Sequence, residues 1–223
     1  MESAPERLKR VQERIQAAAR RSGRDPQKIA LVAVTKSVSF ERVVPLLQAG
    51  VQFLGENRVQ EAQTKYGDRS DRHTNPQAQL HLIGHLQTNK AKKVADHFRW
   101  VQCLDSHELA QKLNQVASKP IAVLVEVKLH EEPNKSGIDE AGLPRLLEDF
   151  REFPHLELRG LMAIPPFFEN PEGVRPYFRK LHDLAERFEL PELSMGMSHD
   201  FEVAIEEGAT MVRIGSALFG ERS

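Results

Sequence analysis

Cysteine, long apolar runs and an excess of one charge are all scarce in this sequence. The 223 residues include a single cysteine, Cys103, and 31 lysines and arginines against 32 aspartates and glutamates, for a net charge of −1. One cysteine allows no internal disulfide, which fits a reducing cytoplasmic compartment. The balanced charge argues against nucleic acid or an anionic membrane as a partner.

Membrane and secretion signals are also missing from the pattern. The apolar runs are strand-sized, well below the ~20 residues of a membrane-spanning helix. Residues 2–23 are rich in charge and lack the apolar core of a secretion signal. We therefore expect a cytoplasmic protein without a membrane partner, folded as a single domain over residues 1–223.

Eight short apolar segments alternate with helical patterns along the chain. Runs such as Ile121–Val127 suit strands that are buried on both faces, as in parallel sheets. Eight alternations of strand and helix predict an α/β fold, a single (β/α)8 TIM-like barrel. An open doubly wound sheet is the alternative, but its glycine-rich phosphate loop does not occur. The expected strands are Ala30–Thr35, Val51–Leu54, Gln79–Ile83, Trp100–Leu104, Ile121–Val127, Leu156–Met162, Leu193–Met195 and Met211–Ile214.

An extra N-terminal helix precedes the first expected strand. Apolar residues recur at helical spacing from Leu8 to Ala18, and Gly23 predicts the end of this helix, which would plug or flank the barrel. Pro45 should kink the next helix or delay its start. The polar segment Tyr66–Ala78 predicts a mobile surface loop. The remaining expected helices are Phe40–Ala49, Val59–Tyr66, Thr88–His97, Ser106–Ala117, Glu140–Phe150, Gly173–Phe188 and Phe201–Glu207.

The functional face of such a barrel lies at the C-terminal ends of its strands. Lys36 follows the first strand, and an ε-amine in a water-poor barrel mouth can condense with an aldehyde; a solvated lysine is the plainer alternative. Gly196-Met197-Ser198 and Gly215-Ser216 follow the seventh and eighth strands, where barrels frequently bind phosphate. Ordinary turns would explain either loop taken alone.

Arg213 lies on the eighth expected strand. A charged residue that points into the barrel needs a partner, so Arg213 would either pair with Glu126 or Asp105 or donate to a ligand. Together, an amine, an arginine and a phosphate cradle predict a site for pyridoxal 5′-phosphate (PLP). His81 and His85 have a spacing that suits a metal on a helix. Because they fall on a strand that runs into a glycine, we expect no metal site.

Seven motifs occur in order from residue 31 onward: Leu31–Lys36, Phe53–Glu61, His81–Lys90, Asn134–Gly137, Gly160–Ile164, Ser194–Phe201 and Val212–Gly220. In these motifs the chain resembles the PLP homeostasis proteins, single-domain relatives of the alanine racemase barrel. Ser216 stands where the family often has threonine, which keeps the hydroxyl.

The resemblance implies a modified TIM barrel, usually monomeric, with PLP held on Lys36 as an internal aldimine, a Schiff base. It implies that Asn57 lies near the cofactor ring and Arg213 at the pyridine nitrogen. Family members buffer PLP, a form of vitamin B6, and affect amino-acid and keto-acid balance without an established catalytic activity. The residues implied as cofactor contacts are Lys36, Asn57, Met197, Ser198, Arg213, Gly215 and Ser216.

One further lysine, Lys135, bears on function. It lies in the loop after the fifth strand and is predicted as a second, weaker PLP contact or transfer point; a solvated loop lysine is the alternative.

The residues also argue against catalysis. An arginine such as Arg213 is always cationic and disfavours the protonated pyridine that PLP chemistry on amino acids needs. Racemisation needs an acid/base group on each face of the substrate carbon, and the only tyrosines are Tyr66 and Tyr177.

We therefore expect a non-catalytic PLP carrier or buffer, with no catalytic residues assigned. One alternative is a PLP-dependent amino-acid racemase of narrow specificity. Another is a protein-interaction module in which PLP is a structural or sensing ligand. The expected partners are PLP and apo PLP-dependent enzymes, and the expected state is a monomer.

Overall fold

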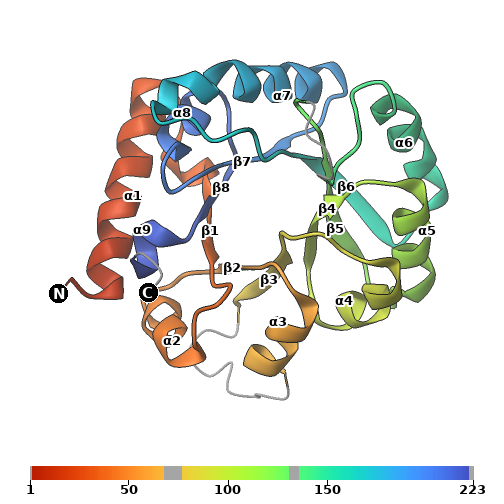
Figure 1. Ribbon diagram of the computed structural model, residues 1–223, viewed down its shortest axis with the longest axis horizontal. Coiled ribbons are helices and arrows are strands. Elements are labelled where there is room, and N and C mark those ends of the chain that lie inside the picture. The colour runs from red at the N-terminus through yellow and green to blue at the C-terminus, as the bar shows by residue number, and fades with distance from the viewer. Residues whose placement is uncertain (1, 68–76, 131–135, 221–223) are drawn as a thin grey trace.

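The chain folds into a closed parallel barrel, which confirms the predicted (β/α)8 architecture (Figure 1). The computed structural model describes residues 2–67, 77–130 and 136–220. The strands follow one another around the barrel in sequence order, and β1 pairs with β8 to close it. The strands are β1 Ala30–Val34, β2 Phe53–Glu56, β3 Gln79–Leu82, β4 Trp100–Leu104, β5 Ile121–Glu126, β6 Leu156–Met162, β7 Glu192–Met197 and β8 Met211–Ile214.

Helices surround the barrel on its outer side (Figure 1). Apolar side chains from these helices and from both faces of the strands form one continuous core. No helix in the described part of the chain is both long and apolar enough to cross a bilayer. The helices are α1 Ala4–Arg21, α2 Phe40–Gln48, α3 Val59–Tyr66, α4 Ala91–His97, α5 His107–Val116, α6 Leu143–Asp149, α7 Arg175–Arg187, α8 Phe201–Glu206 and α9 Ser216–Phe219, with 3-10 turns η1 Pro26–Lys28, η3 Thr88–Lys90, η4 Phe150–Glu152 and η5 Pro171–Val174.

The N-terminal helix α1 flanks the barrel and does not plug it. It begins at a capping box in which Ser3 and Glu6 satisfy each other's backbone N–H groups. It packs against α2, α8 and α9 (Figure 1). Gly23 follows it with a φ of 70°, so the predicted glycine stop is confirmed.

Several predicted boundaries are wrong. Strand β2 lies two residues later than expected, because Gly55 pairs with Val34 of β1 and Glu56 pairs with Leu82 of β3. The short seventh strand extends over Glu192–Met197. The helices expected at 88, 140 and 173 begin later, as α4, α6 and α7. Prolines in the first turns of α6 and α7 favour these starts, because proline lacks a backbone N–H and the N–H groups of a first turn have no partner within the helix.

Pro45 does not delay the start of α2, and the kink that was the other expectation stays a prediction. The helix begins at Phe40, and its residues include Pro45. The carbonyl of Pro45 still accepts from the Ala49 N–H at 3.1 Å, so only the bond that proline cannot donate is lost. The predicted loop Tyr66–Ala78 falls mostly on residues 68–76, outside the described residues, and Lys135 also lies outside them.

Candidate cofactor-binding site

A cavity of about 500 Å³ opens at the C-terminal ends of the strands. This volume is typical of small-molecule sites. Sequence reasoning did not single out Arg42 or Phe219, which also line the cavity; the Arg42 guanidinium donates to the Phe219 carbonyl at 2.6 Å. The structure brings all the predicted contacts except Lys135 into this cavity, namely Lys36, Asn57, Met197, Ser198, Arg213, Gly215 and Ser216.

Lys36 sits in a tight turn directly after β1. The Thr35 carbonyl accepts from the Val38 N–H at 3.0 Å and closes the turn. Ser37 has a φ of 59°, a left-handed conformation that is unusual for a residue other than glycine. The Ser37 N–H donates to the Glu61 carboxylate on α3. The half-buried Lys36 side chain is therefore carried by a backbone fixed from outside the strand.

Behind this turn lies a buried ionic group that we call the Lys65 cluster, made of Thr35, Glu56, Glu61, Lys65 and Tyr66. The Lys65 ammonium donates to the Thr35 carbonyl at 2.6 Å, to Glu56 Oε1 at 2.7 Å and to Glu61 Oε1 at 3.1 Å. An ammonium has three N–H donors, so each of them has an acceptor. The Tyr66 hydroxyl donates to Thr35 Oγ1 at 2.9 Å, and Thr35 Oγ1 donates to Glu56 at 2.7 Å.

The two carboxylates of the cluster have opposite pKa shifts. Burial raises the pKa of Glu56, although Lys65 and Thr35 stabilise its ionised form. Burial also acts on Glu61, but the Ser37 N–H and Lys65 outweigh it and lower the pKa. Glu56 Oε2 is buried without a hydrogen-bond partner, which accounts for its greater cost of ionisation. Lys65 therefore stabilises the ionised form of both carboxylates, and the Ser37 N–H adds to it at Glu61.

Backbone N–H groups and hydroxyls form the opposite wall, at the ends of β7 and β8. Ser198 Oγ accepts from the Gly215 N–H and the Ala217 N–H, each at 3.2 Å. Gly196 has a φ of 88°, and a Cβ there would lie 2.5 Å from the Ala204 side chain, so only glycine fits. This arrangement gathers hydroxyl and N–H donors where the sequence predicted a phosphate.

Arg213 is nearly fully buried and bonds to neutral oxygens. Its guanidinium donates to the carbonyl and hydroxyl of Ser194 at 2.8 and 2.7 Å, and to the Ala163 carbonyl at 2.9 Å. Burial lowers the pKa of Arg213 to about 10, while the charges of Glu126 and Asp200 act in the opposite direction. Arg213 is thus cationic near neutral pH, and it is one of the residues that line the cavity.

A chain of polar side chains continues from Arg213 across the barrel interior. Ser194 Oγ donates to Gln102 at 2.6 Å, and the Gln102 amide nitrogen lies 2.8 Å from His81 Nδ1. Burial lowers the pKa of His81 to about 3, so this ring is neutral and stacks on Trp100. His81 lies on strand β3, as predicted. Within residues 2–67, 77–130 and 136–220, no three His, Cys, Asp or Glu side chains are grouped so that they could hold a metal ion.

Asn57 is placed by a close approach of two strand ends. A Cβ on Gly84 would lie 2.6 Å from the Asn57 carbonyl oxygen, so glycine at this position lets the segment after β3 pass against Asn57. The Ile83 N–H donates to the Glu56 carbonyl at 2.9 Å and fixes the same approach. Asn57 then lines the main cavity together with Ile83.

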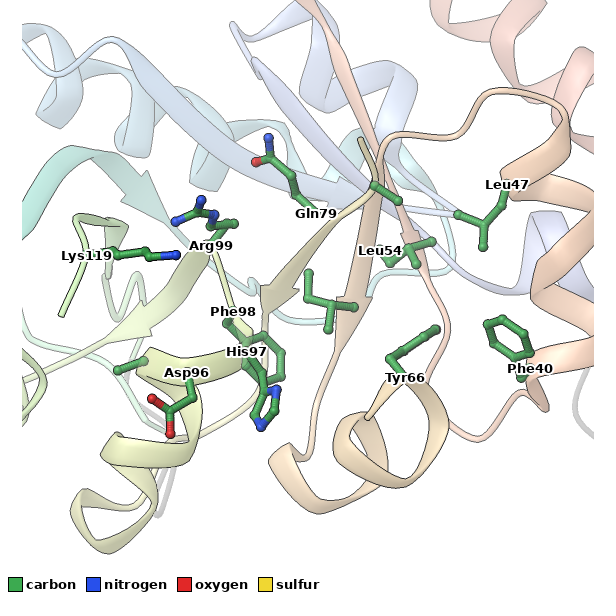
Figure 2. A pocket seen from close by; sticks show the side chains of 13 residues that line it. Phe40, Leu47, Leu54, Tyr66, Gln79, Asp96, His97, Phe98, Arg99 and Lys119 are labelled. Atoms are coloured by element: carbon green, nitrogen blue, oxygen red, sulfur yellow. The ribbon is translucent and has the colours of Figure 1, made fainter. Parts of the chain in front are cut away.

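A second cavity of about 290 Å³ lies on the outer flank of the barrel, between α2, α3, β3 and α4 (Figure 2). Phe40, Leu54 and Tyr66 form its apolar side, while Arg99 and Lys119 lie at the other end in Figure 2. None of the predicted ligand contacts among the described residues lines it. Tyr66 is its link to the main site, because its hydroxyl belongs to the Lys65 cluster.

The donor set of the main cavity fits PLP. The lining holds an amine at Lys36 that could meet an aldehyde, and hydroxyl or N–H groups at Ser198, Gly215 and Ser216 that could meet a phosphate. The Arg213 guanidinium could donate to a ring nitrogen. The fold and this donor set define a class: parallel barrels with a lysine after β1 and an anion cradle after β7 and β8.

Comparison with known proteins identifies the family within this class of barrels to which the chain belongs. Residues 7–223 match the family described as "Alanine racemase, N-terminal domain". The "Pyridoxal phosphate homeostasis protein" of Aquifex aeolicus is 45% identical, with 99% of each chain covered. The protein of the same name from Escherichia coli is 39% identical over 96% of this chain and 95% of its own length. The chain belongs to the pyridoxal phosphate homeostasis protein family, which confirms the resemblance inferred from the sequence motifs.

Solved structures agree with this assignment. PipY of Synechococcus elongatus, in a structure with PLP bound, is 34% identical with a TM-score of 0.81, covering 94% of this chain and all of PipY. An alanine racemase of Corynebacterium glutamicum is 18% identical with a TM-score of 0.65, and the match spans 96% of this chain but 61% of the racemase. The racemase shares the barrel fold.

Proposed function

We propose that this protein binds PLP without catalysing a reaction on it, and that it carries or buffers PLP in support of amino-acid and keto-acid balance. The observation that carries the proposal is the convergence of Lys36 with Ser198, Arg213, Gly215 and Ser216 on one cavity. Relatives named for PLP homeostasis and a similar structure that holds PLP support it.

Lys36 would hold PLP covalently. The deprotonated Lys36 amine would bond to the aldehyde carbon, with release of one water molecule, and form a carbon–nitrogen double bond. The phosphate would lie against Ser198, Gly215 and Ser216, where hydroxyl and N–H donors gather. Arg213 would donate to the ring nitrogen, while Asn57 and Met197 contact the ring.

Two observations favour a binding protein over a racemase. Racemisation needs a second acid/base group opposite the lysine. The chain has two tyrosines, and neither lines the cavity: Tyr66 bonds to Thr35, and Tyr177 packs against Phe168. The cationic Arg213 also disfavours a proton on the pyridine nitrogen, which makes bound PLP a weak electron sink.

An absorbance spectrum before and after borohydride reduction, followed by peptide mapping, tests the covalent assignment. We expect yellow protein and a reduced label on the peptide that carries Lys36. Lys36→Ala should lose the label and retain part of its PLP, because the phosphate contacts remain. A label on any other lysine would overturn the assignment of Lys36.

The proposal extends to a cytoplasmic monomer that passes PLP to apo PLP-dependent enzymes, with Lys135 as a transfer point. Lys135 lies outside the described residues, so this part depends on the sequence motif alone. Lys135→Ala should slow transfer to an apo-enzyme and leave equilibrium loading nearly unchanged. Unchanged transfer kinetics would remove Lys135 from the proposal, and sedimentation of the loaded protein would test the monomer.

A further inference from the structure

The backbone on both sides of Lys36 is held by two side chains of a single helix. On the N-terminal side, Lys65 donates to the Thr35 carbonyl at 2.6 Å. On the C-terminal side, Glu61 accepts from the Ser37 N–H. Both side chains come from α3, and they bond to each other at 3.1 Å. Lys36 is therefore bracketed by a clamp that lies outside its own strand.

We propose that Lys65 and Glu61 are positioning residues that set the direction of the Lys36 amine for covalent capture of PLP. The inference rests on the proposed function, in which Lys36 is the attachment point. Neither Lys65 nor Glu61 lines the cavity, so they act on the ligand only through the turn at residues 35–38.

The turn needs such a clamp because its conformation is intrinsically unfavourable. Ser37 has a φ of 59°, and a left-handed conformation is unfavourable for a residue with a Cβ. The Glu61 carboxylate bonds to the N–H that this conformation exposes. Without that acceptor, Ser37 can return to a more common backbone region, and the Lys36 side chain turns with it.

The clamp is itself anchored in the barrel wall. Lys65 also bonds to Glu56 at 2.7 Å, and the Glu56 side chain is fully buried at the end of β2. The i,i+4 spacing of Glu61 and Lys65 on α3 presents both groups to the same turn. A cluster that only stabilised the fold would not need two bonds to the backbone that flanks Lys36.

Rates of covalent capture test the inference directly. PLP is added to PLP-free protein, and the growth of the visible band of the carbon–nitrogen double bond is followed with time. Glu61→Ala should slow capture by roughly tenfold, because a misoriented amine reaches the reactive geometry less often. Glu61→Gln should stay within about twofold of wild type, because its amide oxygen can still accept from Ser37. Lys65→Met should slow capture at least as much as Glu61→Ala.

Matched variants separate positioning from stability and from ligand affinity. Glu202→Ala removes an ion pair between Arg14 and Glu202 that joins α1 to α8 at 2.8 Å, so it costs stability at the barrel's outer surface and should leave the capture rate unchanged. On a Lys36→Ala background, Glu61→Ala should not change the noncovalent affinity for PLP, measured by equilibrium dialysis. The circular dichroism of each variant confirms its fold.

The outcomes distinguish the two levels of the proposal. Capture by Glu61→Ala at the wild-type rate, or equal slowing by Glu202→Ala, would overturn the positioning role. If Lys65→Met does not fold, the Glu61 pair of variants decides alone. A band that survives Lys36→Ala would instead overturn the attachment point, whatever the Glu61 variants do.

Discussion

The two walls of the main cavity hold their charges in opposite ways. Behind the Lys36 wall, two carboxylates surround the Lys65 ammonium, so the positive charge is matched where it lies. On the β7–β8 wall, Arg213 is almost equally buried but bonds only to the neutral oxygens of Ser194 and Ala163. Ser198 and the Gly215 N–H add uncharged hydrogen-bonding groups to the same wall.

This difference orients a ligand that has an aldehyde at one end and a phosphate at the other. Carboxylates behind the Lys36 wall disfavour a phosphate there. The Arg213 guanidinium and the donors of the opposite wall favour one. The Lys36 wall thus has carboxylates in direct contact with its buried cation, whereas the β7–β8 wall presents a guanidinium bonded to neutral oxygens.

The largest expected effect comes from breaking the Lys36 wall. Lys65→Met leaves the buried Glu56 and Glu61 without their cation, and removing one partner of a buried ion pair costs about 3–5 kcal/mol of folding free energy. Arg213→Met should cost less, about 1–3 kcal/mol, because it leaves only neutral acceptors unpaired. Urea unfolding of PLP-free protein measures both.

The order of these two losses is the informative result. A larger loss for Arg213→Met than for Lys65→Met would show that the positive charge of Arg213 is matched locally after all. Glu202→Ala, which removes an outer ion pair, provides the baseline for a surface contact and should cost no more than about 1 kcal/mol.

The next largest effect is expected on the affinity of the β7–β8 wall for the phosphate of PLP. Replacing Ser198 and Ser216 together with alanine should weaken binding of PLP by about tenfold or more, since a hydrogen bond to a charged group contributes about 1.5–3 kcal/mol. Binding of pyridoxal, which lacks the phosphate, should change much less. The Gly215 and Ala217 N–H groups stay in place, so retention of PLP should fall without being lost.

Equilibrium dialysis against both ligands makes the test. Equal losses for PLP and pyridoxal would place the phosphate elsewhere. Retention of full PLP affinity in the double variant would mean that backbone N–H groups and Arg213 suffice, and the two hydroxyls would then have no part in the cradle.

A smaller effect is expected from removing the positive charge of Arg213. Arg213→Gln keeps a donor but no charge, so the pyridine nitrogen of bound PLP should take up a proton more readily. If the pKa of that nitrogen rises by about one unit, the protonated fraction rises by about tenfold. Exchange of an amino acid's α-hydrogen with deuterated solvent should then increase by about the same factor. Wild-type protein should show almost no exchange, as measured by NMR, and rapid exchange would promote the racemase alternative.

Much of the barrel was predictable because burial on both faces leaves a clear mark in the sequence. Ile121–Glu126 is apolar except for Glu126, half of its residues are β-branched, and it forms β5 one residue shorter than the expected Ile121–Val127. Strand β2 was misplaced because Gly55 and Glu56 have low strand propensity, and pairing with β1 and β3 includes them. The four-residue helix α9 left no periodicity to detect.

The candidate site divides in the same way. Lys36, Ser198 and Gly215 were found because strand ends converge in any such barrel, so their order in the chain is enough. The bonds that Lys65 makes were not predicted, because its acceptors, Thr35 and Glu56, belong to other elements. The i,i+4 spacing of Glu61 and Lys65 was visible, but it is common on solvated helices and marks no site by itself.

The smallest expected effect is a pH dependence that separates the two carboxylates of the Lys65 cluster. Burial raises the pKa of Glu56 above its ordinary value of 4.5, so the folded state holds this proton more tightly than the unfolded state. The stability contribution of Glu56 therefore falls as pH rises through 4.5 toward the folded pKa. Bonds to Ser37 and Lys65 overcome burial and lower the pKa of Glu61, so its contribution is present above 4.5 and is lost as pH falls through the folded pKa.

Two glutamine substitutions measure these opposite pH dependences of stability. The stability of wild type relative to Glu56→Gln should fall as pH rises from about 4 to 7, and that relative to Glu61→Gln should rise with pH and level off near the ordinary carboxyl pKa. Urea unfolding of PLP-free protein at matched pH values measures both. Slopes of the same sign would mean that Glu56 is ionised as easily as Glu61, and that the Lys36 wall is more hydrated than its burial indicates.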